Sequence, residues 1–235
     1  MKKISLLLMM GVMHYSVMSQ VQPVDTASLS HGKLICSVEF GSKLDSRRWI
    51  VEMAPGENST VYAQNNKLVL DTKGGVTVWL NQLLEKNIRI EYDRKVVVAG
   101  GANDRLSDLN NFWMASDPRN KNLFTRNGVL ESYDSLQLYY VGMGGNSNKT
   151  TRFRKYDGTV ERKLLQEYTD AAHLLEANKV YYIVIVVKNG VTSYWVDGLC
   201  YFSFKDPAPL QQGYFGFRST KSHQEISKFR VYQLE

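Results

Sequence analysis

Two arginines stand one residue apart in a basic stretch of the sequence, at positions 152 and 154. If this stretch is a β-strand, Arg152 and Arg154 point to the same face, and Tyr156 continues the row. Neighbouring guanidinium groups offer a fork for a carboxylate or sulfate, with a geometry that lysine cannot copy. Asn146 adds an amide in the loop before the strand. The pattern predicts either an anion-binding strand or a solvated face paired with acidic neighbours.

A second polar cluster surrounds a tryptophan, between positions 103 and 119. Here Arg105 and Asn110 would hydrogen-bond to sugar hydroxyls, and the ring of Trp113 would cover the apolar side of a pyranose. The alternative is a loop closed by local Asn and Asp turns around a buried Trp113, because these residues favour turns for purely local reasons.

A third cluster spans Gly213–Gln224 and contains Arg218 and His223. Imidazole exchanges protons near neutral pH, so His223 is the leading candidate for a general base. Arg218 would help to hold an anionic substrate. A structural or merely exposed loop histidine is the competing interpretation.

Several familiar signatures are missing from the sequence: a phosphate-cradling Gly-Lys-Ser/Thr loop, a Gly-x-Ser-x-Gly elbow, His-Glu-x-x-His and paired Cys-x-x-Cys. Nucleotide, serine-hydrolase and zincin chemistry are therefore disfavoured, and we predict no metal site and no cofactor. A structural calcium ion at Asp104 and Asp108 stays open, although their spacing matches no known calcium loop.

The charge balance is mildly basic, with 29 Lys and Arg against 23 Asp and Glu and a formal net charge of +6. Such an excess permits a polyanionic partner without requiring one. We expect an acidic oligosaccharide as the partner and no nucleic acid, and the oligomeric state stays open.

The first residues predict export. A basic start, Met1–Lys3, precedes a short apolar run and a tolerable cleavage site before Gln20, which is typical of a secretory signal. The run is too short to span a bilayer. We expect a signal peptide at 1–19, a polar lead at 20–32 and one domain at 33–235, periplasmic or secreted. An oxidising compartment would allow Cys36 and Cys200 to form a disulfide, and two separate thiols are equally compatible with the sequence.

Period-two alternation recurs along the chain and predicts an all-β protein, with two antiparallel sheets packed as a sandwich. The apolar run Val180–Val187 is typical of a central strand, and Asn189-Gly190 and Asp197-Gly198 predict hairpins after it. Only Leu164–Leu175 has a helical pattern. Further strands are expected at 33–40, 49–53, 67–71, 76–80, 88–92, 111–115, 135–143, 150–155, 214–218 and 226–234. The long irregular segments 100–110, 117–134 and 142–149 are where we expect a site.

Three stretches carry a family resemblance: Asp104–Asp117, Leu138–Asn146 and Gly213–Thr220. They resemble a Bacteroidetes family of concanavalin A-like jelly rolls from polysaccharide-utilisation loci. Some relatives, in loci for the algal polysaccharide ulvan, are oligosaccharide dehydratases that eliminate water from a terminal uronic acid. The resemblance implies a jelly roll and a carbon-oxygen lyase activity on the non-reducing-end uronate of an acidic, ulvan-type oligosaccharide.

Such an elimination places three demands on the site. Loss of the C5 proton builds negative charge on the carboxylate, which Arg152, Arg154 and Asn146 would stabilise. A base must take the proton and an acid must protonate the leaving hydroxyl, roles for which His223 and Tyr140 are the candidates.

Two other functions stay open at this point. One is a non-catalytic carbohydrate-binding module, which needs exposed aromatic faces. The other is a glycoside hydrolase, which needs two carboxylates across a cleft, for which Asp104, Asp108 and Asp117 are available.

Overall fold

Sixteen strands account for most of the chain that the computed structural model describes, residues 32–56 and 58–235. The predicted signal peptide at 1–19 and nearly all of the polar lead lie outside the described residues. Among the residues described, no helix is long and apolar enough to cross a membrane.

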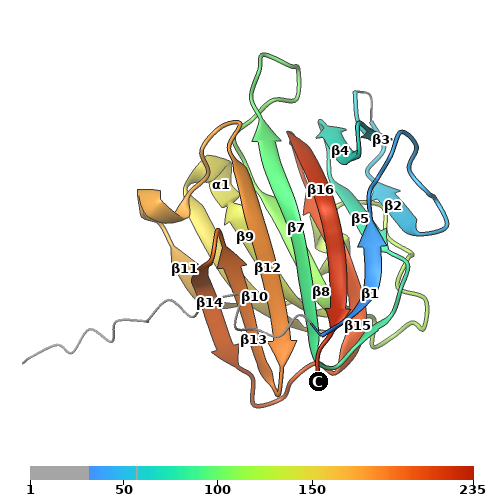
Figure 1. The fold of residues 1–235 in the computed structure, drawn as a ribbon, viewed down its shortest axis with the longest axis vertical. Helices are drawn as coiled ribbons and strands as arrows, with labels where there is room; N and C mark the ends of the chain where they lie inside the picture. Colours follow the sequence, from blue (N-terminus) through green and yellow to red (C-terminus); the bar gives the residue numbers. More distant parts are fainter. Residues whose placement is uncertain (1–31, 57) are drawn as a thin grey trace, which may run out of the picture.

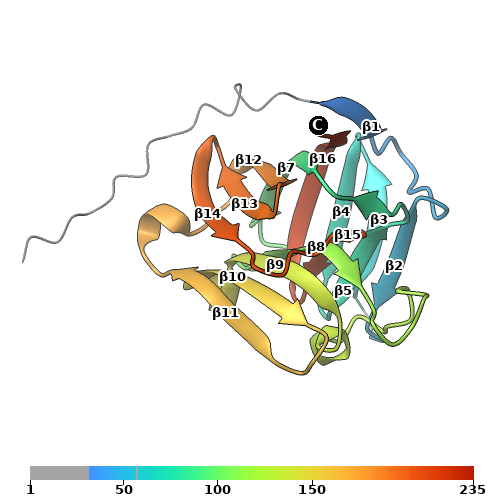
Figure 2. The same cartoon turned by 90° about the horizontal axis from the view of Figure 1, so that it is seen from below.

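The strands form two antiparallel sheets of eight, packed face to face (Figures 1 and 2). The first sheet has the order β14 (Leu199–Lys205), β13 (Val191–Val196), β12 (Val180–Lys188), β7 (Ile88–Val97), β16 (Ser222–Gln233), β4 (Lys67–Thr72) and β3 (Thr60–Gln64), with β1 (Lys33–Val38) paired to β16. The second sheet has the order β11 (Arg162–Tyr168), β10 (Thr150–Asp157), β9 (Gln137–Gly144), β8 (Leu109–Ser116), β15 (Gln212–Ser219), β5 (Val76–Leu80) and β2 (Trp49–Met53), with β6 (Leu84–Glu85) paired to β15. The predicted two-sheet antiparallel sandwich is confirmed.

Local turn chemistry explains the β12–β13–β14 meander. Asn189 and Gly190 adopt φ values of 52° and 77°, and Asp197 and Gly198 adopt 50° and 84°. Asn, Asp and Gly tolerate this left-handed region best, and the right-handed twist of paired strands requires it in a two-residue hairpin. Both predicted hairpins are confirmed.

Aromatic side chains fill the space between the sheets. Trp49 of the second sheet packs edge-on against Phe229 of the first, with ring centroids 5.3 Å apart, and stacks on Phe217 at 6.1 Å. All three rings are buried, and burial of a ring of this size stabilises the fold by about 1.5–3 kcal/mol.

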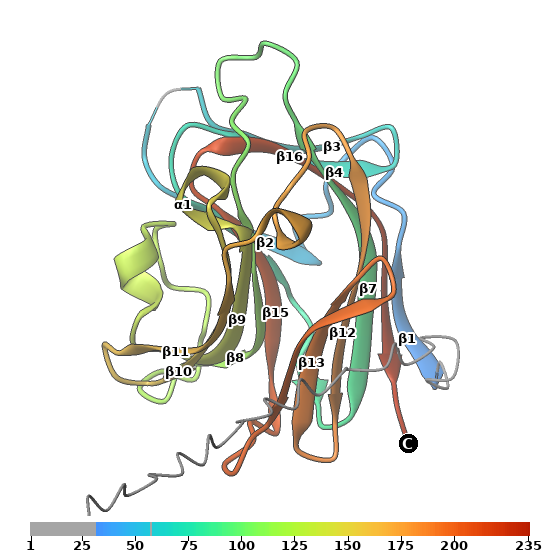
Figure 3. The same cartoon turned by 90° about the vertical axis from the view of Figure 1, so that its left-hand side faces the viewer.

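A second, smaller apolar cluster lies on the outer face of the second sheet, under the segment that joins β8 to β9. This segment includes the short helix η2 (Leu130–Tyr133) and stands outside the sandwich (Figure 3). The buried Glu52 carboxylate fastens it, accepting hydrogen bonds from Trp79 Nε1 at 2.8 Å, Tyr133 Oη at 2.9 Å and the Arg126 amide at 2.6 Å. The segment therefore forms a fixed wall on this face.

The helical expectation for Leu164–Leu175 is wrong. Residues Arg162–Tyr168 form β11, and only Ala171–His173 make a short 3₁₀ turn, η3. Pairing along the open edge of β10 satisfies the backbone of β11 and overrides the weak helical pattern. The strand β3 and the two-residue β6 were not predicted either.

The two cysteines are separate thiols in the structure. Cys36 lies on β1 and Cys200 on β14, with β16, β7, β12 and β13 between them in the same sheet. At roughly 4.8 Å per strand, the separation is far beyond the reach of a disulfide.

Candidate functional site

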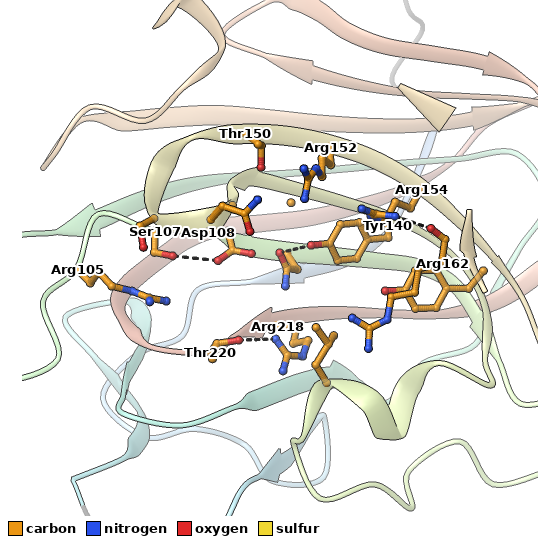
Figure 4. A pocket seen from close by; sticks show the side chains of 17 residues that line it. Arg105, Ser107, Asp108, Tyr140, Thr150, Arg152, Arg154, Arg162, Arg218 and Thr220 are labelled. Carbon is orange, nitrogen blue, oxygen red and sulfur yellow. Dashed lines mark hydrogen bonds between the residues drawn. The ribbon is translucent and has the colours of Figure 1, made fainter. Parts of the chain in front are cut away.

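A cavity of about 370 Å³ opens on the outer face of the second sheet, beside the β8–β9 segment. Five arginines line it: Arg105, Arg152, Arg154, Arg162 and Arg218. The other lining residues are Ser107, Asp108, Asn110, Leu130, Tyr140, Gly142, Gly145, Asn146, Ser147, Thr150, Tyr156 and Thr220. Figure 4 shows the arginines around the hollow, with Arg152 and Arg154 on one side of it and Arg218 on the other.

Strand periodicity places three of these side chains. Arg152, Arg154 and Tyr156 alternate with the buried Phe153, which packs into the core between the sheets. The expectation that the two arginines and Tyr156 share a face is confirmed. Arg162 joins them because β11 pairs with β10 so that Arg162 lies opposite Tyr156.

Arg218 is the least solvated cation of the cavity, with 1% of its surface exposed. Its Nη1 donates to Thr220 Oγ1 at 2.8 Å and its Nη2 to the Gly128 carbonyl at 3.3 Å. The buried Nε has no partner, and no carboxylate of the described residues lies within 4.0 Å of the guanidinium. Burial lowers the pKa of Arg218, and the charge of Asp108 opposes that shift only in part. A buried cation without an anion is costly, so this position is prepared for a negative charge.

The other four arginines differ in how far they are neutralised. Arg162 makes a bidentate pair with Asp134, at 2.7 and 2.8 Å, and Arg152 binds Glu167. The guanidinium groups of Arg105 and Arg154 donate only to backbone carbonyl groups. Arg162 also lies 3.8 Å from Oε1 of the exposed Glu131. With Asp108 included, five guanidinium groups therefore face four carboxylates, and the cavity keeps a positive excess.

Tyr140 and Asn110 form a hydrogen-bonded pair in the cavity wall. Tyr140 Oη donates to Asn110 Oδ1 at 2.8 Å, and its ring stacks on Tyr156 with centroids 6.0 Å apart. Burial and the nearby Asp108 charge raise the pKa of Tyr140, and burial raises the pKa of Tyr156 to about 12. Both phenols therefore hold their protons at neutral pH, and Tyr140 can donate one.

Asp108 supplies the carboxylate of the cavity lining, where it accepts a hydrogen bond from Ser107 Oγ at 3.1 Å. The buried Gln224 of β16 holds the preceding backbone from behind, since its Nε2 donates to the Ser107 carbonyl at 3.2 Å. The position of Asp108 is thus set by Ser107 within the lining and by Gln224 behind it.

Comparison with known proteins places the chain in a family. Residues 70–229 match the sequence model described as Domain of unknown function (DUF6250). The chain belongs to this family. No protein of curated function matches the sequence significantly.

Solved structures share the fold of this DUF6250 chain. A protein of unknown function with a galectin-like fold from Bacillus subtilis is 18% identical, with a TM-score of 0.72 over 87% of this chain and 97% of that one. An endo-β-1,3-glucanase from Pyrococcus furiosus is 13% identical, with a TM-score of 0.61 over 85% and 94%. Carbohydrate-binding module CBM66 from Bacillus subtilis is 12% identical, with a TM-score of 0.55 over 79% and 96%. The similarities confirm the jelly-roll fold, and the narrower resemblance to ulvan-locus dehydratases stays a prediction.

The DUF6250 fold brings together most of the residues that the sequence singled out. Seven of them line the cavity: Arg105, Asn110, Tyr140, Asn146, Arg152, Arg154 and Arg218. They come from β8, β9, β10, β15 and the adjoining turns, which are distant in sequence but adjacent in the second sheet.

Trp113 does not belong to this group. Its side chain is buried between the sheets, where Nε1 donates to Thr192 Oγ1 at 2.9 Å and the ring stacks on Phe153. Strand alternation explains the correction: Asn110 and Phe112 face outward on β8, and Trp113 faces inward. Trp113 therefore offers no ring face to a sugar, and we leave it out of the proposed site.

His223 is also absent from the cavity lining. It lies at the start of β16 in the first sheet, and its Nδ1 is 3.2 Å from Oδ1 of Asp104. The other oxygen of Asp104 accepts the Ala99 and Gly101 amides, at 2.6 and 2.9 Å. These contacts account for Asp104 without a calcium ion, and among the described residues no group of three or more His, Cys, Asp or Glu side chains is arranged for a metal. His223 thus supports a loop and lies outside the cavity in which we predicted it to act as a general base.

Arg162 was not predicted at the site, Asp108 was named only as a possible calcium ligand or hydrolase carboxylate, and Tyr156 only as a residue on the same strand face as the arginines. Arg162 was missed because the segment around Leu164 was expected to be helical. Only the pairing of β11 with β10 places Arg162 opposite Tyr156. The signal for Tyr156 was its place in the row of Arg152 and Arg154.

Proposed function

We propose that the cavity binds the terminal uronic acid of an acidic oligosaccharide and that the protein is a dehydratase, which eliminates water from this residue. The observation that carries the proposal is Arg218, a buried guanidinium in the cavity wall with no carboxylate within 4.0 Å. A carboxylate ligand would supply the missing charge through charge-assisted hydrogen bonds.

The size and composition of the cavity support a small polar anion. A volume of about 370 Å³ lies at the lower end of the range for ligand pockets, and most of the lining residues carry polar or charged side chains. The fold supports the carbohydrate part of the proposal, because the similar structures include a glucanase and a carbohydrate-binding module.

The elimination can be written with the groups that line the cavity. The Asp108 carboxylate takes the C5 proton, the freed electron pair forms the C4–C5 double bond, and the C4–oxygen bond breaks. Tyr140 protonates the departing hydroxyl, which leaves as water, and then recovers a proton from Asp108 through solvent. The arginines stabilise the charge that develops on the uronate carboxylate during proton removal.

A glycoside hydrolase has less support from this geometry. Hydrolysis by the usual mechanisms uses two carboxylates on either side of the scissile bond. Among the described residues that line the cavity, Asp108 alone carries a carboxylate, and Asp104 and Asp117 are engaged elsewhere.

Incubation with uronate-terminated oligosaccharides tests the proposal. We expect ultraviolet absorbance from the conjugated double bond to rise, and the product to have lost one water by mass spectrometry. Calorimetric titration with the same oligosaccharides provides the second readout. Binding without any change of mass would make the protein a binding module, and absence of both signals across glucuronate, galacturonate and iduronate termini would overturn the proposal.

A further inference from the structure

The turn between β9 and β10 has a left-handed backbone. Asn146, Ser147 and Asn148 have φ values of 53°, 57° and 62°, and Gly144 before them has 88°. For residues with a Cβ, this region costs roughly 1–2 kcal/mol each, with Asn at the lower end. Three such residues in succession, beside a cavity, store strain that a purely structural turn could avoid with glycine.

Contacts on the far side of the turn hold it in this shape. Asn148 uses both ends of its amide, since Nδ2 donates to the Leu175 carbonyl at 2.9 Å and Oδ1 accepts from the Leu175 amide at 2.8 Å. Gly144 has a φ of 88°, which residues with a Cβ rarely adopt, and a Cβ there would also displace the Leu175 side chain, whose Cδ1 would lie 2.2 Å away. Asn148 and Gly144 therefore anchor the turn to the rest of the fold. The side chains of Asn146 and Ser147 take no part in this anchoring.

Asn146 and Ser147 are exposed, and both line the cavity. Neither side chain hydrogen-bonds to another residue within 32–56 and 58–235. With Thr150, at the start of β10, they form a neutral, polar wall of the cavity at the β9–β10 turn. Figure 4 shows Thr150 on the opposite side of the hollow from Arg218. An amide and two hydroxyls suit uncharged hydroxyl groups, and guanidinium groups suit a carboxylate.

We propose that the turn Gly144–Asn148, which is left-handed at Asn146, Ser147 and Asn148, is the specificity element of the cavity. In this proposal Asn146 and Ser147 contact the ring hydroxyls of the bound sugar acid. This inference rests on the proposed function, because it assumes a uronate whose carboxylate faces the arginines. The ring hydroxyls then point to the neutral wall. The strain keeps the two side chains directed at the ligand rather than at the protein.

Glycine substitution separates the shape of the turn from its side chains. Asn146→Gly and Ser147→Gly preserve the left-handed backbone and remove the polar groups. We expect both variants to melt at a higher temperature than the wild type, because the strain is relieved. We also expect each to bind methyl glucuronide about 3- to 10-fold more weakly, the loss of one neutral hydrogen bond.

The matched control is Asn65→Gly in the β3–β4 hairpin, where Asn65 is exposed and has a φ of 52°. It lies outside the cavity lining. Its melting temperature should rise in the same way, with no change in affinity.

Calorimetry with the methyl glycosides of glucuronic, galacturonic and iduronic acids measures the specificity. The wild type should distinguish these sugars, and the affinities of Asn146→Gly and Ser147→Gly for them should converge. A wild-type protein that binds uronates while both variants keep its full discrimination would overturn this inference alone. A wild type that binds none of the sugars would overturn the proposed function and the inference with it.

Discussion

Arg218 and Gly128 join the sheet beneath the cavity to the segment that walls it, because Nη2 of Arg218 donates to the Gly128 carbonyl oxygen over 3.3 Å. Gly128 has a φ of 82°, and a Cβ there would lie 2.5 Å from the Ala54 amide nitrogen. Only glycine fits this close approach, so the carbonyl that orients the buried cation is fixed by the backbone of the wall.

Replacing Arg218 tests whether the cation serves the ligand. Arg218→Met keeps the bulk and removes the charge, so we expect affinity for a uronate to fall about 10- to 100-fold, the loss of a charge-assisted hydrogen bond. The free energy of unfolding without ligand should stay level or rise, since a buried unpaired charge is removed. Calorimetry and denaturant unfolding measure the two effects. The control is Arg47→Met, because Arg47 lies on the exposed surface. The prediction is contradicted if Arg218→Met binds uronates as tightly as this control.

Tyr140 should act on the chemical step more than on binding. Tyr140→Phe removes the proton donor and leaves Asn110 Oδ1 without its partner. We expect the elimination rate to fall by about 100-fold or more, with affinity changing by less than about 10-fold. Single-turnover rates and titration of the same oligosaccharide separate these quantities. Tyr214→Phe, outside the cavity lining, is the control and should leave the elimination rate and the affinity unchanged. If Tyr140→Phe eliminates water as fast as the wild type, Tyr140 is not the proton donor.

His223 should prove to be a support for Asp104. His223→Ala removes the contact to the Asp104 carboxylate, and we expect about 0.5–1.5 kcal/mol less stability and less than about a 10-fold loss of activity. His223→Asn, which can still donate to Asp104, should restore most of both. A general base would behave differently: its loss would cost far more activity, and asparagine would not rescue it. Denaturation curves and initial rates of the two variants decide the matter.

Protonation of Asp117 at low pH should destabilise the β8–β9 segment that forms the wall of the cavity. Burial acts to raise the pKa of this carboxyl, but hydrogen bonds from Arg126 and the Arg119 amide outweigh it, and the pKa is lowered. The depressed pKa contributes stability that is present above the unfolded value of about 3.9 and is lost as the pH falls through the folded value. Denaturant unfolding between about pH 6 and pH 2 should show this loss.

The matched variant for Asp117 is Asn, which cannot ionise. At neutral pH, Asp117→Asn should cost about 3–5 kcal/mol, because the buried Arg126 loses its partner. Its unfolding free energy should decline less steeply below about pH 4 than that of the wild type. If the unfolding free energy of Asp117→Asn falls with decreasing pH as steeply as that of the wild type, the pH dependence arises from other carboxyl groups.

Local sequence determined most of the strands and part of the chemistry, although β3, β6 and β11 were not predicted from it. Alternation placed Arg152, Arg154 and Tyr156 on one face, and the turn residues Asn189 and Gly190 defined a hairpin, because both signals depend only on backbone geometry within a few residues. The tertiary structure decided which polar clusters meet. His223 and Arg218 are five residues apart in sequence, yet β15 and β16 belong to different sheets, so only Arg218 reaches the cavity. The inward direction of Trp113 and the pairing that brings Arg162 to the site likewise depend on which sheet face is buried and which strand edge is open, and these are set by contacts between residues distant along the chain.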